Sequence, residues 1–192
     1  VNKLKSVHLI MLEDPVEYEF ISGKALIHQR EKERDFLKFS DGIRAALRED
    51  PDIIVVGEMR DSETMRAALL AAETGHLVLA TMHSSRAVEA ISRVVHAFPA
   101  DEQDEIRMVL SSVLRSISAQ LFYKREGESI LLREILMMTP AIARLIRDGR
   151  DEQIRSYMGL SQGSMRTIES RARAISRTWE EKEKQKLAIF LK

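Results

Sequence analysis

The 192-residue sequence contains no cysteine, which excludes disulfides and any zinc or iron–sulfur site with cysteine ligands. It contains no apolar run near the roughly 18 to 20 residues of a membrane span, and no signal peptide is visible. It has no excess of charge, because 30 Lys and Arg balance 30 Asp and Glu. We therefore expect no nucleic-acid partner and no membrane insertion, and the composition is compatible with the cytoplasm.

Several catalytic patterns are also missing. There is no H-E-x-x-H, no serine or cysteine nucleophile constellation and no G-x-x-x-x-G-K-[ST] phosphate-binding loop. What remains is 44% apolar and 31% charged, which is typical of a globular protein. The length suits one sizeable core, or one domain with a helical appendage.

Strand and helix patterns alternate along the first half of the chain and predict an α/β fold with a parallel sheet. The expected strands cover residues 7–12, 25–28, 53–56 and 77–82. The expected helices cover residues 41–49, 62–74 and 86–97. Ser40 and Asp61 are the predicted N-caps of the first two, and Gly75 is the predicted stop of the second. The pattern does not reveal the order of the strands.

The second half of the chain is expected to be mainly helical. An amphipathic helix is predicted from Asp101 to Ile117, followed by a strand pair at 121–123 and 130–137. Thr139 and Pro140 are typical of a helix start. We therefore divide the chain into a core at 1–138 and a helical subdomain at 139–192. The charged tail of that subdomain is either a solvated surface or a helix that docks on a partner.

The most informative segment is the buried strand Ile53, Ile54, Val55 and Val56, which stops at Gly57-Glu58. This pattern resembles a Walker B element. A carboxylate at such a strand end could deprotonate an attacking water or hold water around Mg²⁺. Strands that end in Gly-Glu are common, so the pattern alone is weak.

Acidic residues also follow the first strand. Glu13, Asp14 and Glu17 could bind Mg²⁺ or position water, since hard cations take oxygen ligands. The alternative is an acidic surface loop. Carboxyl ends of parallel strands share one edge of a sheet, so these groups would approach Glu58 if their strands were neighbours.

Two histidines flank the third apolar strand. His76 and His83 lie seven positions apart, an odd spacing that points them to opposite faces of a regular strand and disfavours a metal pair. A histidine at the strand end could donate a hydrogen bond to a phosphate. Arg60 is a candidate nucleotide-sensing or salt-bridging group, or simply a solvated arginine.

Taken together and in order, several boxes resemble the secretion ATPases that drive type IV pili and type II secretion. The boxes are LEDPVE at 12–17, HQRE at 28–31, AALREDPDIIVVGEMRD at 45–61, AAETGHLVLATMHSS at 71–85 and FPADEQ at 98–103. The likeness is strongest to pilus-retraction ATPases of the PilT type, over roughly residues 7–170.

The resemblance implies a RecA-like ATPase core that uses ATP and Mg²⁺. It further implies a cytoplasmic homohexameric ring, peripheral to the inner membrane, that docks on the pilus platform protein. Glu13 and Glu17 match the acidic box, and Glu58 matches the catalytic base of Walker B. Mg²⁺ would be organised through Glu13 or Glu58, while His76 and His83 would contact nucleotide phosphates or a subunit boundary.

The chain departs from this family in two ways. The family's phosphate-binding loop is expected before Val1, so we expect an N-terminal truncation and a chain that does not bind ATP tightly or act by itself. The retraction subgroup carries an AIRNLIRE-like segment, whereas residues 141–148 read AIARLIRD, with Ala143 and Arg144 in place of arginine and asparagine. The lack of cysteine disfavours the zinc-bearing type II secretion branch.

Three hypotheses remain. The first is the C-terminal part of a hexameric motor for type IV pilus retraction. The second is a regulatory or structural paralogue without a phosphate-binding loop that joins such a ring. The third is a pilus-assembly ATPase or a type II or type IV secretion ATPase with the same core.

Overall fold

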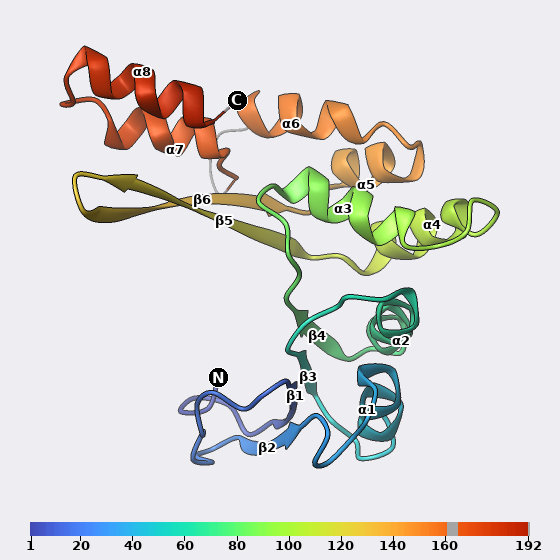
Figure 1. The fold of residues 1–192 in the computed structure, drawn as a ribbon. Coiled ribbons are helices and arrows are strands. Elements are labelled where there is room, and N and C mark those ends of the chain that lie inside the picture. Colours follow the sequence, from blue (N-terminus) through green and yellow to red (C-terminus); the bar gives the residue numbers. More distant parts are fainter. Residues whose placement is uncertain (161–164, 192) are drawn as a thin grey trace. The chain divides into compact units, whose positions relative to one another are not determined.

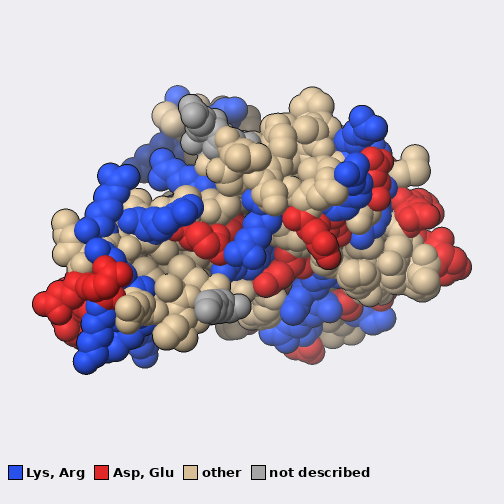
Figure 2. Space-filling model, turned by 90° about the horizontal axis from the view of Figure 1, so that it is seen from above, with Lys and Arg blue, Asp and Glu red and all other residues tan. Residues whose placement is uncertain are grey.

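The computed structural model describes residues 1–160 and 165–191. The chain forms two compact units, residues 1–82 and residues 83–192, and each has its own hydrophobic core. On the face drawn in Figure 2, Lys and Arg are interspersed with Asp and Glu, in keeping with the zero net charge. None of the described helices is long and apolar enough to cross a membrane.

The first unit is built on a four-stranded, fully parallel sheet (Figure 1). Its strands, in spatial order, are β2 (Leu26–Glu31), β1 (His8–Glu13), β3 (Ile53–Val56) and β4 (Leu77–Ala80). The predicted α/β fold is confirmed, and the three strands whose ends carry candidate groups are indeed neighbours. Their carboxyl ends therefore lie along one edge.

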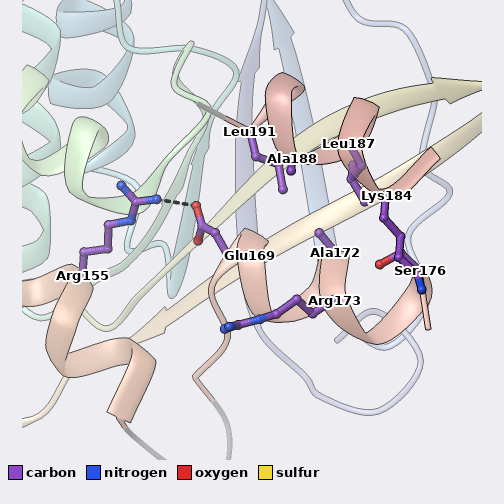
Figure 3. Close-up of a pocket in the computed structure, with 9 residues that line it drawn as sticks. All are labelled: Arg155, Glu169, Ala172, Arg173, Ser176, Lys184, Leu187, Ala188 and Leu191. Atoms are coloured by element: carbon purple, nitrogen blue, oxygen red, sulfur yellow. Dashed lines mark hydrogen bonds and ion pairs between the residues drawn. The ribbon is translucent and has the colours of Figure 1, made fainter. Parts of the chain in front are cut away.

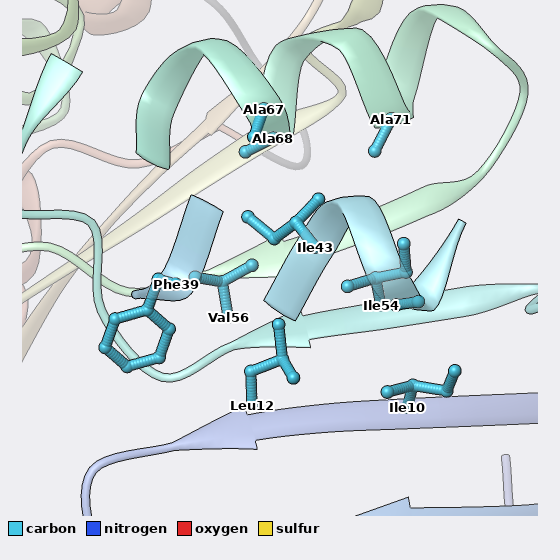
Figure 4. Packing of buried hydrophobic residues seen from close by; sticks show 10 residues of the cluster. Ile10, Leu12, Phe39, Ile43, Ile54, Val56, Ala67, Ala68 and Ala71 are labelled. Atoms are coloured by element: carbon cyan, nitrogen blue, oxygen red, sulfur yellow. The ribbon is translucent and has the colours of Figure 1, made fainter. Parts of the chain in front are cut away.

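Helices α1 (Phe39–Ala46) and α2 (Ser62–Glu73) cover one face of this sheet. Figure 4 shows Leu12 and Val56 pointing from the strands toward the helices, and Ile43 of α1 and Ala71 of α2 belong to the same buried cluster. All four side chains are fully buried. At the edge of the sheet, the β4 residues Leu77 and Leu79 remain 46% and 49% exposed.

The second unit combines helices with a long antiparallel hairpin. Its elements are α3 (Ala87–His96), α4 (Gln103–Val113), β5 (Ser116–Arg125), β6 (Glu128–Met137), α5 (Pro140–Arg147), α6 (Asp151–Leu160), α7 (Ile168–Ile175) and α8 (Glu181–Phe190). Glu126 and Gly127 form the hairpin turn, both with positive φ. Tyr123 and Leu132 of the hairpin share a core with Ile168 of α7 and Leu187 of α8.

Among the sequence predictions about element ends, those for the start of α1 and the end of α4 are wrong for reasons that the packing explains. Ser40 does not cap α1, because the helix begins one residue earlier, where Phe39 packs into the core and leaves Ser40 buried in the first turn. The amphipathic helix does not reach Ile117, because α4 ends at Val113 and β5 begins at Ser116. Ile117 instead pairs with Leu136 in the hairpin, so strand pairing prevails over the helical pattern there.

The division expected between residues 138 and 139 stays a prediction about family organisation. In the structure, α5 packs against α4, and α7 packs on β6. The helices that follow Thr139 thus belong to the same compact unit as residues 83–138.

Candidate active site

Gly57 holds the end of β3 tightly between its two neighbouring strands. The N–H of Gly57 donates to the carbonyl of Leu12 at 2.7 Å, and the carbonyl of Gly57 accepts from the hydroxyl of Thr81. A Cβ at this position would lie only 2.9 Å from the Leu12 oxygen, so glycine is required by the close approach of the backbones. The direction in which residue 58 leaves the sheet is therefore fixed.

Glu58 emerges from this point with a side chain that is only 14% exposed. Its Oε2 lies 2.6 Å from Nε of Arg60, whose side chain is 69% exposed. An ion pair with so exposed a partner contributes little to stability, so Arg60 can leave Glu58 at small cost. The structure thus brings two predicted site residues, Glu58 and Arg60, into direct contact.

Glu58 and Arg60 also line a cavity of about 420 Å³ at the carboxyl edge of the sheet. The remaining lining residues are Asp14, Lys32, Leu37, Lys38, Phe39, Ser40, Asp61, Ser62, Glu63 and Thr64. Helices α1 and α2 both begin here and contribute the partial positive charge of their N-termini. The lining therefore mixes carboxylates with cationic groups, and Lys32, Lys38 and Arg60 are each paired with a carboxylate of the same cavity.

Asp14 is held by a lysine within this cavity. Nζ of Lys32 lies 3.0 Å from Oδ2 of Asp14, and this hydrogen bond raises the pKa of Lys32 above its usual value. Lys32 therefore remains charged at neutral pH.

Glu13 and Glu17 occupy different surroundings from Glu58. Glu13 ends β1 opposite Glu31 of β2, and its Oε2 accepts a hydrogen bond of 2.8 Å from Nε2 of Gln29. Glu17 is exposed on the loop between β1 and β2. No group of three or more carboxylate or histidine side chains within the described ranges could together hold a metal ion. The Mg²⁺ role of Glu13 or Glu58 stays a prediction.

The two predicted site histidines belong to different units, and only His76 lies in the unit that contains β3. His76 precedes β4, the end opposite to Thr81, and its Nδ1 is 3.0 Å from the carbonyl oxygen of Ala71. The structure therefore does not bring His76 to Glu58. His83 is the first residue of the second unit and is exposed. The predicted contacts of both with phosphates or a subunit boundary stay predictions.

A larger cavity, of about 600 Å³, contains none of the predicted site residues (Figure 3). It is lined by Arg155, Glu169, Ala172, Arg173, Ser176, Lys184, Leu187, Ala188 and Leu191, all in the second unit. Glu169 is already paired with Arg86 and Arg155. Size alone therefore does not identify the site in this chain.

Three residues of the site region escaped the sequence analysis. Gln29 touches Glu13, Lys32 holds Asp14, and Thr81 holds Gly57. The signal for Gln29 was its place in the HQRE box. It is a polar residue two positions before Glu31, and therefore on the same face of the strand. Thr81 likewise lies within the quoted box at 71–85, whereas Lys32 lies just outside the HQRE box and no local pattern marks it.

Comparisons with known proteins identify the family of this chain. The family described as type II/IV secretion system protein matches residues 1–126. The type IV pilus retraction ATPase PilT of Pseudomonas aeruginosa is 49% identical over 157 residues, covering 81% of this chain and 46% of that protein. A twitching motility protein of Neisseria gonorrhoeae is 41% identical over 180 residues, covering 92% of this chain and 48% of that protein.

A solved structure gives the same result. The crystal structure of the pilus retraction motor PilT with bound ADP superposes with a TM-score of 0.84 at 42% identity. The match covers 92% of this chain and 50% of that one. The chain thus spans about half the length of the proteins it matches. Since the family match covers well over half of the residues, this chain belongs to the type II/IV secretion system protein family.

Proposed function

We propose that residues 1–192 are the C-terminal part of an ATP-hydrolysing motor that powers type IV pilus retraction. The observation that carries this proposal is Glu58, a largely buried carboxylate held at the carboxyl end of a central parallel strand beside a cavity lined by charged groups of both signs. The similarity to a pilus retraction ATPase supports the same assignment.

These residues hold part of the chemistry that ATP hydrolysis needs. When bound, ATP with its Mg²⁺ would supply the phosphoryl group that is transferred to water. Glu58 would accept the proton of that water at its carboxylate, and Glu13 and Glu17 would organise water and the Mg²⁺ shell. Arg60 would turn from Glu58 toward the new anionic charge, and His83 and His76 would contact the phosphates or the neighbouring subunit.

The test is Glu58→Gln in the full-length protein that contains these residues. Removal of a general base is worth about 10² to 10⁴ in rate, so turnover should fall by that factor while ATP binding stays near the native value. Glu73→Gln, an exposed carboxylate at the end of α2, is the matched control and should leave both quantities unchanged. Near-native turnover of Glu58→Gln would remove Glu58 from this role.

The motor is proposed to be a homohexameric ring at the cytoplasmic face of the inner membrane, docked on the pilus platform protein. Residues 1–192 contain no G-x-x-x-x-G-K-[ST] sequence, so these residues alone should not turn over ATP. Steady-state assays of the isolated residues and of the full-length protein, at equal concentration, would show turnover only for the latter.

The retraction subgroup is favoured by the segment AIARLIRD, which forms α5. Ile142 and Ile146 bury their side chains fully, whereas Arg144, one of the two departures from the subgroup, is 77% exposed. The packing of α5 is therefore independent of that departure.

A second candidate function is favoured by the same lack of a phosphate-binding loop in these residues. A regulatory paralogue would join a ring of active subunits without binding ATP itself. Co-elution of the purified chain with a loop-bearing homologue would support it, and separate elution would count against it.

A further inference from the structure

We infer that Gln29 is the positioning residue for Glu13, holding its carboxylate and the β1–β2 loop in one arrangement at the edge of the sheet. This inference rests on the proposed ATPase function and on the role proposed there for Glu13. It assigns a task to a residue that sequence reasoning left without one.

The side-chain amide of Gln29 makes three hydrogen bonds. Nε2 donates to Oε2 of Glu13 at 2.8 Å and to the carbonyl of Tyr18 at 2.8 Å, while Oε1 accepts from the N–H of Phe20 at 2.7 Å. Both amide protons and one oxygen lone pair are thus engaged. The amide is fixed between the strand end and the loop.

The orientation of this amide follows from its partners. The N–H of Phe20 can only donate, and the carbonyl of Tyr18 can only accept, so the oxygen must face Phe20 and the nitrogen must face Tyr18. The second proton on that nitrogen then points to Glu13. No carboxylate could replace the amide, because it would offer no donor to these two acceptors.

Strand pairing explains why residue 29 reaches Glu13. Met11 pairs with Gln29 and Glu13 pairs with Glu31, so alternation places all four on one face of the sheet. This is the face opposite to Ile10 and Leu12, which α1 and α2 cover. Glu31 assists by accepting from the N–H of Val16 at 3.0 Å. Two β2 side chains therefore anchor the loop that carries Glu17.

The test measures ATP turnover of the full-length protein with Gln29→Leu, a side chain of similar size without hydrogen bonds. Loss of a residue that orients a site carboxylate typically costs roughly 10- to 100-fold in activity. We expect that fall in kcat, with KM for ATP within about twofold, because substrate binding is not removed. Ser22→Ala is the matched control: it removes a loop-to-β2 bond, the one from the N–H of Ile27, without touching Glu13.

A double variant separates positioning from general damage. If Gln29 acts through Glu13, Gln29→Leu should lower turnover no further in a Glu13→Gln background. If the fold losses of turnover for the two single substitutions multiply in the double variant, the inference is overturned. A near-native kcat of Gln29→Leu would overturn it as well. Native turnover of Glu13→Gln would overturn the inference together with the proposed role of Glu13. A marked loss for Glu13→Gln with none for Gln29→Leu would overturn the inference alone.

A second variant guards against misfolding as an explanation. Gln29→Glu places a second carboxylate beside Glu13, and two like charges so close cannot both stay ionised easily. A proton taken up at lower pH restores a donor between them. Turnover of Gln29→Glu relative to the native protein should therefore rise as pH falls, whereas a parallel pH profile would contradict positioning through Glu13.

Discussion

Because Gly57 has no Cβ, the backbone at the end of β3 can approach β1 closely, and this approach positions the candidate base Glu58. Alanine there would place its Cβ 2.9 Å from the Leu12 carbonyl, a contact that only a backbone shift relieves. Overpacking of this kind typically costs about 1–3 kcal/mol. Gly57→Ala should therefore lower the free energy of unfolding by that amount in urea denaturation.

The control is Gly159→Ala in α6, where an added Cβ meets nothing within 4 Å. Helical glycine is less favourable than alanine by roughly 0.5–1 kcal/mol, so this variant should be neutral or slightly more stable. Equal losses for both variants would show that the close approach at Gly57 is not the cause.

Single residues with local partners were predictable from sequence, and those with distant partners were not. Asp61 accepts from the N–H of Thr64 at 2.8 Å and Gly75 has φ of 102°, both as expected from their helix-end patterns. Ser40 failed as a cap because Phe39 packs into a core that its neighbours in sequence do not reveal. The HQRE box drew attention to the segment around Gln29, but its contact with Glu13 depends on the β1–β2 register, which no local pattern carries.

Among the elements, α3 and α7 share one buried carboxylate. Glu134 of β6 is 3% exposed and accepts from the N–H of Ala87 at 2.8 Å and of Ile168 at 3.3 Å. These are the first residues of the two helices, and Arg86 caps α3 with no side-chain hydrogen bond of its own. Glu134 thus serves as a shared cap from the hairpin.

We expect Glu134→Ala to destabilise the second unit by roughly 1–3 kcal/mol for each buried N–H left without an acceptor. Glu134→Gln keeps one acceptor oxygen and should lose less. Glu128→Ala, an exposed residue at the start of β6, should change stability by less than about 0.5 kcal/mol. The same loss at both positions, measured by thermal unfolding, would contradict the shared cap.

The hairpin and α8 are joined by a pair whose contribution depends on pH. Arg125 donates to Glu183 at 2.8 and 2.6 Å and lies 4.4 Å from the ring centre of Trp179. This hydrogen bond lowers the pKa of Glu183 below its ordinary 4.5. A carboxyl pKa lowered by folding contributes stability above the unfolded value, and that contribution is lost as pH falls through the folded value.

Glu183→Gln should therefore lower the Tm at neutral pH, with the difference from the native protein shrinking as pH falls below about 4.5. Glu181→Gln, at a 78% exposed side chain of the same helix, should change the Tm little at any pH. A pH-independent difference for Glu183→Gln would assign its effect to packing instead.

At this scale the sequence predicted element types better than their ends. Gly127 marked the hairpin turn because few other residues accept its φ of 89°. The end of α4 at Val113 was missed because the apolar spacing continues to Ile117, where pairing with Leu136 takes over.

At the scale of the whole molecule, each unit has a hydrophobic core of its own, and this separation is testable. Ile54 is fully buried in the core of the first unit, and Leu132 is fully buried in that of the second. Truncation of either to alanine should cost about 2–5 kcal/mol. In hydrogen exchange, Ile54→Ala should lower protection within residues 1–82, and Leu132→Ala within residues 83–192. Protection lost equally in both units would mean one cooperative core.

The parallel sheet was predictable because buried β-branched runs alternate with helical patterns, whereas the strand order was not. That order decides which carboxylates meet. It places Glu58 between the ends of β1 and β4, and leaves His76 at the other end of β4.

The exposed outer side of β4 also affects how this chain would behave in concentrated solution. An edge strand has unpaired backbone N–H and C=O groups that can bind a strand of another molecule. The exposed apolar side chains of Leu77 and Leu79 make this strand pairing more favourable. Isolated residues 1–192 would consequently tend toward aggregation through sheet extension. Leu79→Lys should reduce this aggregation, because a charged and hydrated side chain on an edge strand opposes pairing with a strand of another molecule.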